Sequence, residues 1–339
     1  VHILQGRILG KMEALGFQLQ NEAVLETLTL DVLKTSEIEG EILSAEQVRF
    51  SIARQLGMEI SGSVPADRYV DGVVQMMLDA TQNFSDKLTS ERLFNWHAAL
   101  FPSGRSGMYP ITVGNWRTDM KGPMQVVSGA FGKEKIHFQA PDSAKIPAEM
   151  ALFLDWLNTN ESLDSAIKAG VAHLWLLTIH PFDDGNGRIA RAVTDLLMAR
   201  SDASAQRFYS LSAQIRLDRN AYYAILEKTQ KGNLDLTDWL QWFLKTLIKA
   251  LKSTDQVLKR VLSKADFWQK NSSIPLHERQ KKMLNKLLDG FDGHLTSDKW
   301  AKISKCSKDT AIRDLNDLLS KNILQKDEAG GRSTRYRMS

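Results

Sequence analysis

Residues 180–191 combine one histidine, acidic residues, two glycines and two arginines within twelve positions, His-Pro-Phe-Asp-Asp-Gly-Asn-Gly-Arg-Ile-Ala-Arg. An imidazole ordinarily titrates near neutral pH, so His180 is a candidate base, and Asp184 adds a carboxylate. Arg188 and Arg191 lie three residues apart, so their guanidinium groups should project toward one region. Two such groups bind phosphate oxygens well. These residue types indicate chemistry on a polyphosphate.

The elements on both sides of this segment should bring these groups together. A buried helix is predicted before it from the apolar residues Val171, Leu174, Trp175 and Leu177. Pro181 disfavours helical geometry at His180, so this helix should end there. A second helix starts at once, with one apolar face formed by Ile189, Val193, Leu196 and Leu197. Gly185 and Gly187 let the loop turn its N–H groups toward one point, and a helix N-terminus favours anions.

A charged loop between two core helices would be the ordinary interpretation of any one of these residues. Their joint occurrence favours a nucleotide site instead. The segment also resembles the signature of the Fic family, His-x-Phe-x-(Asp/Glu)-Gly-Asn-Gly-Arg-x-x-Arg, at every position. This resemblance implies a mainly α fold, in which an all-α core over roughly residues 90–250 carries the signature loop and a small β-hairpin flap.

The resemblance also implies an activity, that of a protein adenylyltransferase. Such an enzyme transfers AMP from ATP to a serine, threonine or tyrosine hydroxyl of a target protein, with Mg²⁺ as cofactor. His180 would be the general base and Asp184 would hold Mg²⁺. The phosphates would be bound by Gly185, Asn186, Gly187, Arg188 and Arg191. The hydroxyl would attack the α-phosphorus in line, with pyrophosphate leaving.

Three further features extend this assignment. Phe182 would plug into the core and fix the loop. Tyr222 and Tyr223 open a helix at about the distance where Fic proteins line the adenine pocket, although aromatic residues there also suit a core. The resemblance leaves open self-modification, a homodimer, the transfer of other phosphate-linked groups and the removal of AMP.

A hairpin is predicted from two short strands, residues 124–128 and 135–139, joined by a loop with Gly129 and Gly132. A structural hairpin and a docking edge are equally compatible with the pattern, and the resemblance favours docking. Residues Ile136, His137 and Phe138 would then pair with an extended target segment through main-chain hydrogen bonds.

Thr35-Ser36-Glu37-Ile38-Glu39-Gly40 resembles the inhibitory motif of the Fic family, (Ser/Thr)-x-x-x-Glu-(Gly/Asn). Glu39 would pair with Arg191 and keep it from the γ-phosphate. Thr35, one turn earlier on the same face, would help to anchor the helix. Glu37 and Glu41 are expected to point away, since each lies about 200° around a continuous helix from Glu39.

Three segments are expected along the chain: a helical N-terminal region with the inhibitory helix (1–89), the Fic core (90–268) and a winged helix-turn-helix domain (276–339). The last has three short amphipathic helices, then a strand, a Gly330-Gly331 turn and a strand. Its recognition helix would be residues 307–320.

A DNA-binding regulator with an accessory Fic domain is therefore the second functional class. DNA binding is favoured by the hydroxyl of Thr310 and by the basic side chains of Lys308, Arg313, Arg332, Arg335 and Arg337. It is opposed by Asp309, Asp314 and Asp317, which would repel phosphates, and winged helices also bind proteins.

Composition narrows the class of protein. The 339 residues suffice for two or three domains, with 43% hydrophobic and 25% charged residues. Cys306 is the only cysteine, so an internal disulfide is excluded and a cytoplasmic location is the simplest expectation. No apolar run approaches the length of a bilayer span. Residues 271–339 hold 14 Lys and Arg against 9 Asp and Glu, which places the basic excess in the last segment. The absence of an initial Met leads us to expect residues before Val1.

Overall fold

The computed structural model describes residues 1–58, 64–120, 122–129, 135–159, 163–289, 291, 293–327 and 334–339. The chain forms two compact units, Val1–Asp255 and Gln256–Ser339, and the division falls within a helix. Both units are mainly helical, and their only sheets within the described ranges are small antiparallel strand pairs. The expected fold class, mainly α with a small hairpin, is confirmed.

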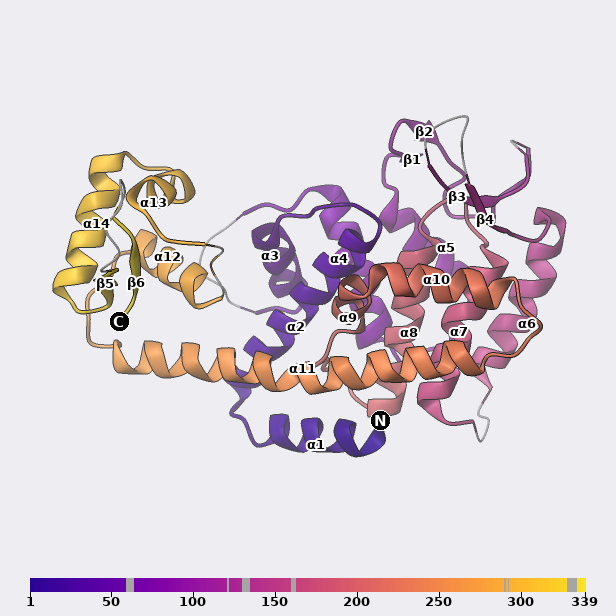
Figure 1. Ribbon diagram of the computed structural model, residues 1–339, viewed down its shortest axis with the longest axis horizontal. Coiled ribbons are helices and arrows are strands. Elements are labelled where there is room, and N and C mark those ends of the chain that lie inside the picture. The colour runs from indigo at the N-terminus through magenta and orange to yellow at the C-terminus, as the bar shows by residue number, and fades with distance from the viewer. Residues whose placement is uncertain are drawn as a thin grey trace. The chain divides into compact units, whose positions relative to one another are not determined.

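Unit 1 contains the helices α1 (His2–Glu13), α2 (Phe17–Ile38), α3 (Ala45–Gln55), α4 (Arg68–Gln82), α5 (Ser90–Leu100), α6 (Ile146–Asn158), α7 (Ser165–Ile179), α8 (Asn186–Asp202), α9 (Leu211–Leu217), α10 (Arg219–Gln230) and the first part of α11 (Thr237–Lys270) (Figure 1). A 3-10 turn, Ser143–Lys145, precedes α6. The strands β1 (Arg105–Ser106) and β2 (Tyr109–Pro110) form one pair, and β3 (Gln125–Ser128) and β4 (Lys135–Gln139) form the other.

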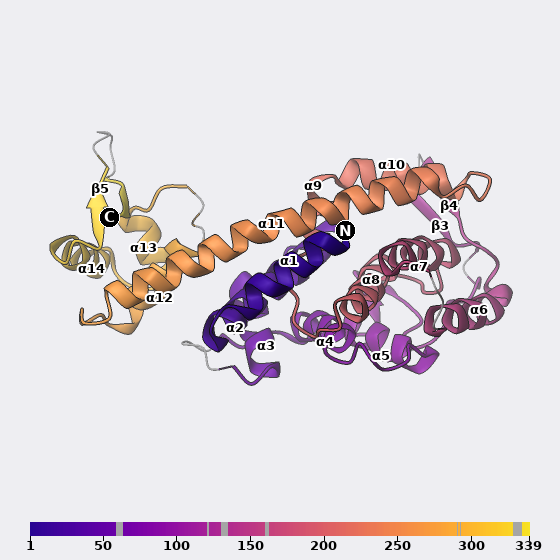
Figure 2. The ribbon, with the colours of Figure 1, turned by 90° about the horizontal axis from the view of Figure 1, so that it is seen from below.

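Helices α7 and α8 lie side by side at the centre of unit 1 (Figure 2). Nearly every side chain of α8 is buried, because α2, α4 and α5 also pack against it. Small residues such as Ala190 and Ala192 allow these neighbours to come close. The short connection between the two helices is the signature loop, so the loop is held between two buried helices.

Helix α2 carries the predicted inhibitory motif, Thr35 to Gly40, at its C-terminal end. Its apolar residues Leu25, Leu28 and Val32 lie at helical spacing and are buried. The helix packs against α8 and α9 within the same compact unit as the signature loop. A packed helix therefore holds the motif near the loop.

Unit 2 contains the end of α11, then α12 (Glu278–Leu288), α13 (Ser297–Ser304), α14 (Lys308–Ser320) and the antiparallel strands β5 (Leu324–Lys326) and β6 (Tyr336–Met338). Its core gathers around Trp300, Leu315 and Leu318. The element order is the one expected for a winged helix-turn-helix, and that identification stays a prediction. The predicted Gly330-Gly331 turn and Arg332 lie outside the described residues.

None of the helices in the described ranges has an apolar stretch long enough to cross a bilayer.

Candidate active site

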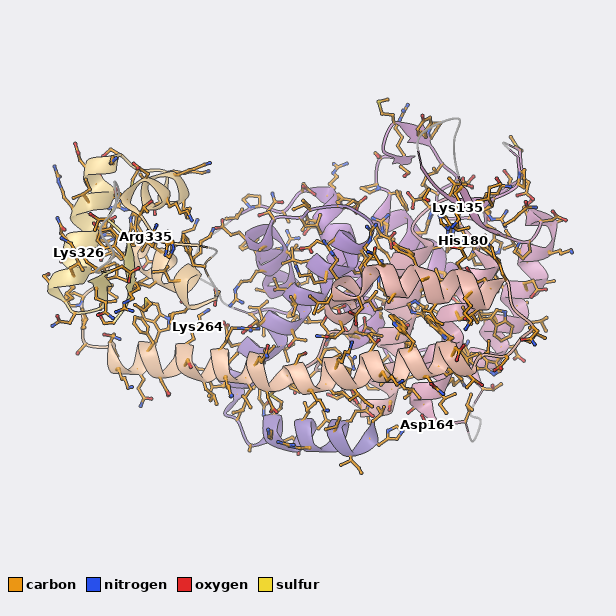
Figure 3. The ribbon with its side chains drawn as sticks, viewed as in Figure 1. Lys135, Asp164, His180, Lys264, Lys326 and Arg335 are labelled. Atoms are coloured by element: carbon orange, nitrogen blue, oxygen red, sulfur yellow. The ribbon has the colours of Figure 1, made fainter. Side chains whose placement is uncertain are left out.

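The signature loop begins where α7 stops. His180 follows the last helical residue and adopts the left-handed region with φ 52°, which turns the chain out of the helix ahead of Pro181. The buried guanidinium of Arg117 fixes this turn, because its Nε donates to the His180 carbonyl at 2.7 Å. The Arg117 backbone N–H also donates to the Pro181 carbonyl at 2.9 Å. Figure 3 labels His180 at this end of α7.

The His180 imidazole is arranged as a base. Its Nδ1 lies 3.2 Å from the Leu177 carbonyl oxygen, which can only accept, so Nδ1 carries the proton. The other nitrogen, Nε2, then presents a lone pair. Burial lowers the pKa of His180 below its usual value of 6.5, so the ring is neutral at pH 7. Both features suit removal of a proton from a hydroxyl.

Phe182 and Asn186 hold the loop from inside. Phe182 is fully buried, as expected, and its ring stacks on His97 with centroids 4.3 Å apart. Both side-chain groups of Asn186 bond to the Phe182 backbone, at 3.0 Å and 2.8 Å. The Asn186 side chain is therefore used to shape the loop, and its backbone N–H is one of the first donors of α8, which have no partner within the helix.

The N-terminus of α8 has the features of an anion site. Gly185 precedes the helix with φ 81°, a conformation that glycine adopts readily, and a Cβ there would meet the Phe101 ring at 2.9 Å. No side chain from the described residues caps this end of α8. Gly187 has the Glu39 carboxylate directly above its Cα, so any side chain at Gly187 would collide with that group. An acidic group therefore already lies where the helix favours negative charge.

Asp184 lies on the solvent side of the loop with 43% of its side chain exposed. It accepts a hydrogen bond from the Ser106 hydroxyl and lies 4.0 Å from Arg188 Nη2. Within the described ranges there is no group of three or more His, Cys, Asp or Glu residues that could hold a metal alone. One accessible carboxylate beside a phosphate site fits Mg²⁺, which usually takes one or two carboxylates and completes its shell with phosphates and water.

Arg191 pairs with the inhibitory motif. Its Nη2 donates to Glu39 Oε1 at 2.7 Å, and its Nε donates to Thr35 Oγ1 at 2.6 Å. The Arg191 side chain is only 1% exposed, whereas that of Glu39 is 31% exposed. Gly40 follows with φ 89°, which ends helix α2 just beyond Glu39. The predicted Glu39–Arg191 pair is thus present, with Thr35 in contact.

Arg188 pairs with a residue that was expected to point away. Its Nη1 donates to Glu41 Oε2 at 3.0 Å and to the Tyr69 hydroxyl. The expectation for Glu41 was wrong because it assumed a continuous helix, whereas α2 ends at Ile38 and the chain turns at Gly40. Glu37, which is still helical, does point elsewhere and pairs with Lys34 and Arg216. Two carboxylates, not one, therefore face the two signature arginines.

Each signature arginine keeps one buried N–H group without a partner among the described residues, Nη1 of Arg191 and Nε of Arg188. A buried donor of this kind costs free energy unless it is hydrogen-bonded. Such atoms often mark the place of a bound ligand. A polyphosphate at the N-terminus of α8 would supply the missing acceptors.

The two tyrosines of α10 differ in their surroundings. Tyr222 is 1% exposed, and its hydroxyl lies 2.8 Å from His173 Nε2, within an aromatic cluster that includes Trp239. Tyr223 is 38% exposed, and its hydroxyl donates to the Ile38 carbonyl at 3.3 Å. Tyr223 alone therefore presents a surface near the end of α2, while Tyr222 lies in the core.

The flap consists of β3 and β4, at the positions where the two strands were predicted. Their register pairs Val127 with Ile136 and Val126 with Phe138. Ile136 is 49% exposed, and Phe138 is partly buried. Just past β4, the Pro141 carbonyl accepts from Arg117 at 2.5 Å, so the arginine that fixes His180 also holds the base of the flap. Figure 3 labels Lys135 at the start of β4.

The predicted nucleic-acid residues of unit 2 are only partly available. Arg313 is exposed, whereas Lys308 pairs with Asp298 at 2.8 Å. The predicted repulsion from Asp314 is wrong, because this residue is 5% exposed and accepts from Arg279 and from Trp300 inside the domain. Three of the remaining predicted residues have charged or polar partners: Asp317 pairs with Lys321, Arg335 with His294 and Arg337 with Asp327. The Thr310 backbone N–H donates to Ser307 Oγ at the start of α14. Asp309 is exposed.

Several residues that build the site were not found from the sequence. They share no motif and lie 63 to 147 positions from the signature residues that they contact. They are Glu41, Tyr69, His97, Ser106 and Arg117. His97, for example, bonds to the Asp184 carbonyl at 3.2 Å, and burial lowers the pKa of His97 to about 4, so it is neutral and structural.

Known proteins match parts of this chain. Residues 87–198 match the Fic/DOC family, and residues 1–58 match a domain of unknown function, DUF4172. Protein adenylyltransferase fic-1 of Caenorhabditis briggsae is 30% identical over 212 residues, which cover 62% of this chain and 38% of that protein. The chain therefore spans well under half the length of this curated relative.

Two solved structures share the fold. A Fic family protein from Desulfovibrio desulfuricans has a TM-score of 0.53 and 20% identity, with 99% of this chain and 94% of that chain covered. A Fic domain containing signaling protein from Bacteroides thetaiotaomicron has a TM-score of 0.55 and 20% identity, with 76% of this chain and 97% of that chain covered. At this identity the two likenesses support the fold alone.

Proposed function

We propose, because this chain contains a Fic/DOC domain, that it transfers AMP from ATP to a serine, threonine or tyrosine hydroxyl of a target protein. The observation that carries the proposal is a pair of buried N–H groups, on Arg188 and Arg191, that have no partner among the described residues and lie beside the N-terminus of α8, which no described side chain caps. This arrangement calls for a ligand with several anionic oxygens, which the triphosphate of ATP provides.

His180 is the proposed base. Its Nε2 would accept the proton of the target hydroxyl while the hydroxyl oxygen attacks the α-phosphorus and pyrophosphate leaves. The N–H groups of Gly185, Asn186 and Gly187 would orient the α- and β-phosphates. Asp184 would hold Mg²⁺, which, when bound, neutralises phosphate charge.

The exposed edge of the flap is the proposed dock for the target. The main chain of residues 136–138 would pair with an extended segment, which positions a hydroxyl without reading much sequence. The link through Arg117 from Pro141 to His180 supports this role, since it sets the flap at a defined place relative to the base. Of the two α10 tyrosines, Tyr223 is the one with exposed surface for the adenine ring.

The inhibitory motif is proposed to restrain the enzyme through two ion pairs. Glu39 engages Arg191 and covers Gly187, and Glu41 engages Arg188. Both arginines would bind the β/γ end of ATP, so the nucleotide and the two carboxylates compete for them. Productive binding then requires the end of α2 to move away.

The test uses purified protein with Mg²⁺ and ATP labelled at the α- or the γ-phosphate, followed by mass spectrometry. Glu39→Gly should raise the transfer of the α-label, and His180→Ala should abolish it. His2→Ala, a change at an exposed histidine, serves as the matched control. Transfer of the γ-label, or α-label that persists in His180→Ala, would refute the mechanism. A parallel reaction with AMP-modified protein tests removal of AMP, and other labelled nucleotides test the choice of base.

Nucleic-acid binding by unit 2 is proposed as an accessory function, because Asp314 is turned inward and leaves Arg313 exposed on α14. Phosphate contacts by such a side chain weaken as salt rises. The full chain should bind duplex DNA at low salt, and Arg313→Gln should reduce both the affinity and its salt dependence. Absence of binding at low salt would point to a protein partner instead.

A further inference from the structure

The guanidinium group of Arg188 is held by two aromatic residues as well as by its ion pair. Its Cζ lies 5.1 Å from the centroid of the Phe101 ring and 5.9 Å from that of the Tyr69 ring. The Tyr69 hydroxyl also accepts a hydrogen bond from Arg188 Nη1, the same nitrogen that donates to Glu41. Cations are attracted to the faces of aromatic rings. Glu41 and two aromatic side chains therefore fix the direction of this buried arginine.

These partners come from different elements. Tyr69 is the second residue of α4, whose N-cap Asp67 accepts from the Val70 N–H, and α4 packs against α8. Phe101 directly follows α5, which also packs against α8. Glu41, by contrast, lies beyond the end of α2, in the part of the chain that is proposed to move away from the nucleotide. Such a movement takes Glu41 from Arg188 and leaves both aromatic residues in place.

Tyr69 and Glu41 also differ in charge. A carboxylate neutralises the guanidinium, whereas a tyrosine hydroxyl is uncharged at neutral pH and leaves the positive charge available to phosphates. Arginine has five N–H donors, and Tyr69 takes one of the two on Nη1. Departure of Glu41 frees the other, and Nε of Arg188 has no partner among the described residues. With Tyr69 alone, Arg188 keeps its direction and gains donors for phosphate oxygens.

We propose that Tyr69 is a positioning residue, which holds Arg188 in place for the β- and γ-phosphates of ATP once Glu41 has moved away. The inference rests on the proposed binding of ATP at the start of α8. A long side chain that is already fixed loses less freedom when the ligand binds, so its contacts contribute more to affinity. Because Tyr69 acts through Arg188, its effect should be large for a nucleoside triphosphate and small for AMP, which has only the α-phosphate.

The experiment uses the full chain with Glu39→Gly, in which the restraint is weakened, and Mg²⁺. Calorimetry measures the binding of α,β-methylene ATP, and AMP is titrated in competition with this analogue. Tyr69→Phe keeps the ring and removes the hydroxyl. It should weaken binding of the analogue by about 10-fold, the lower range for a hydrogen bond to a charged group, and that of AMP by less than about 2-fold. Tyr109→Phe, a change at a tyrosine that is 75% exposed, is the matched control.

Three results in Tyr69→Phe would overturn the inference: an unchanged affinity for the analogue, an equal loss for both nucleotides, or tighter binding. An equal loss would show that Tyr69 supports the site as a whole, and tighter binding would make it part of the restraint with Glu41. Tyr69→Ala, which removes the ring as well, should weaken the analogue at least as much as Tyr69→Phe, and a smaller loss would also count against Tyr69. If the analogue does not bind to the chain with Tyr69 intact, the proposed function itself is refuted.

Discussion

Replacement of Glu39 by glutamine removes one charge from the inhibitory helix and keeps its size. In the structure Glu39 Oε1 accepts from Arg191 Nη2 at 2.7 Å, and Arg191 is buried. Loss of one partner from a fully buried ion pair costs about 3 to 5 kcal/mol. The cost should be smaller here, because Glu39 is 31% exposed and Arg191 keeps two bonds to Thr35.

A contribution of about 1 to 3 kcal/mol is therefore expected for this pair, which corresponds to about a 5- to 150-fold effect on a competing ligand. If ATP must displace Glu39 to reach Arg191, Glu39→Gln should raise kcat/KM for ATP by that factor. The same substitution should lower the free energy of unfolding of unit 1, since the contact is lost in the absence of ligand too.

The assay is steady-state transfer of the α-label at several ATP concentrations, together with chemical denaturation. Glu37→Gln is the matched control, because Glu37 lies on the same helix and pairs with Lys34 and Arg216 but does not contact Arg191. The reasoning fails if Glu39→Gln leaves kcat/KM unchanged, or if Glu37→Gln raises it as much. If kcat/KM for ATP rose without any loss of stability, the inhibition would not depend on this ion pair.

Three further predictions follow from the same contacts. Glu41→Gln should tighten the binding of a non-hydrolysable ATP analogue by about 2- to 5-fold in calorimetry. The Glu41 carboxylate is 42% exposed, so its ion pair with Arg188 is worth only about 0.5 to 1 kcal/mol. Weaker binding in Glu41→Gln would show that Glu41 helps to bind the nucleotide and does not compete with it. Because burial lowers the pKa of His180 and only the neutral ring is a base, kcat/KM should fall on the acid side below pH 6.5, and a midpoint above 6.5 would contradict this assignment. Asp314→Asn should destabilise unit 2 by about 2 kcal/mol in thermal unfolding, because it weakens a buried acceptor of Arg279, while transfer of AMP stays unchanged.

The elements that position the site were predictable because their ends carry strong local signals. Asp164 accepts from the first N–H groups of α7, and Pro181 follows its end, so the spacing of the apolar residues and the residues at both ends indicate the same helix. The helix Ser90–Leu100 carries a similar signal, since the Thr89 side chain accepts from the Arg92 backbone N–H at its start. Helix α9 was not predicted, because its seven residues are too few for a clear period.

The error at Glu41 had a signal in the sequence that was not used. A glycine directly after the last residue of a helix commonly adopts the left-handed conformation and ends the helix. Gly40 does so, with φ 89°, and redirects Glu41 toward Arg188. By contrast, no local signal connects Arg117 or Ser106 to the signature loop. Their contacts are set by the tertiary fold, which a single sequence does not specify by pattern.

Release of the restraint should involve the last turn of α2 and not the whole helix. Further back the helix is held by buried contacts, such as Asp31 with the Ser210 hydroxyl, and by its apolar face. In the last turn Ile38 is buried, and the polar contacts near the helix end are Glu39 with Arg191, and the Ile38 carbonyl with Arg219 Nε at 2.7 Å and with Tyr223. Fraying the terminal turn would break these bonds and expose Ile38, whereas removing α2 would also expose Leu25, Leu28 and Val32. A nucleotide that draws Arg191 away and packs on Tyr223 would weaken two of these polar contacts at once, so we expect ATP binding to favour opening of this turn.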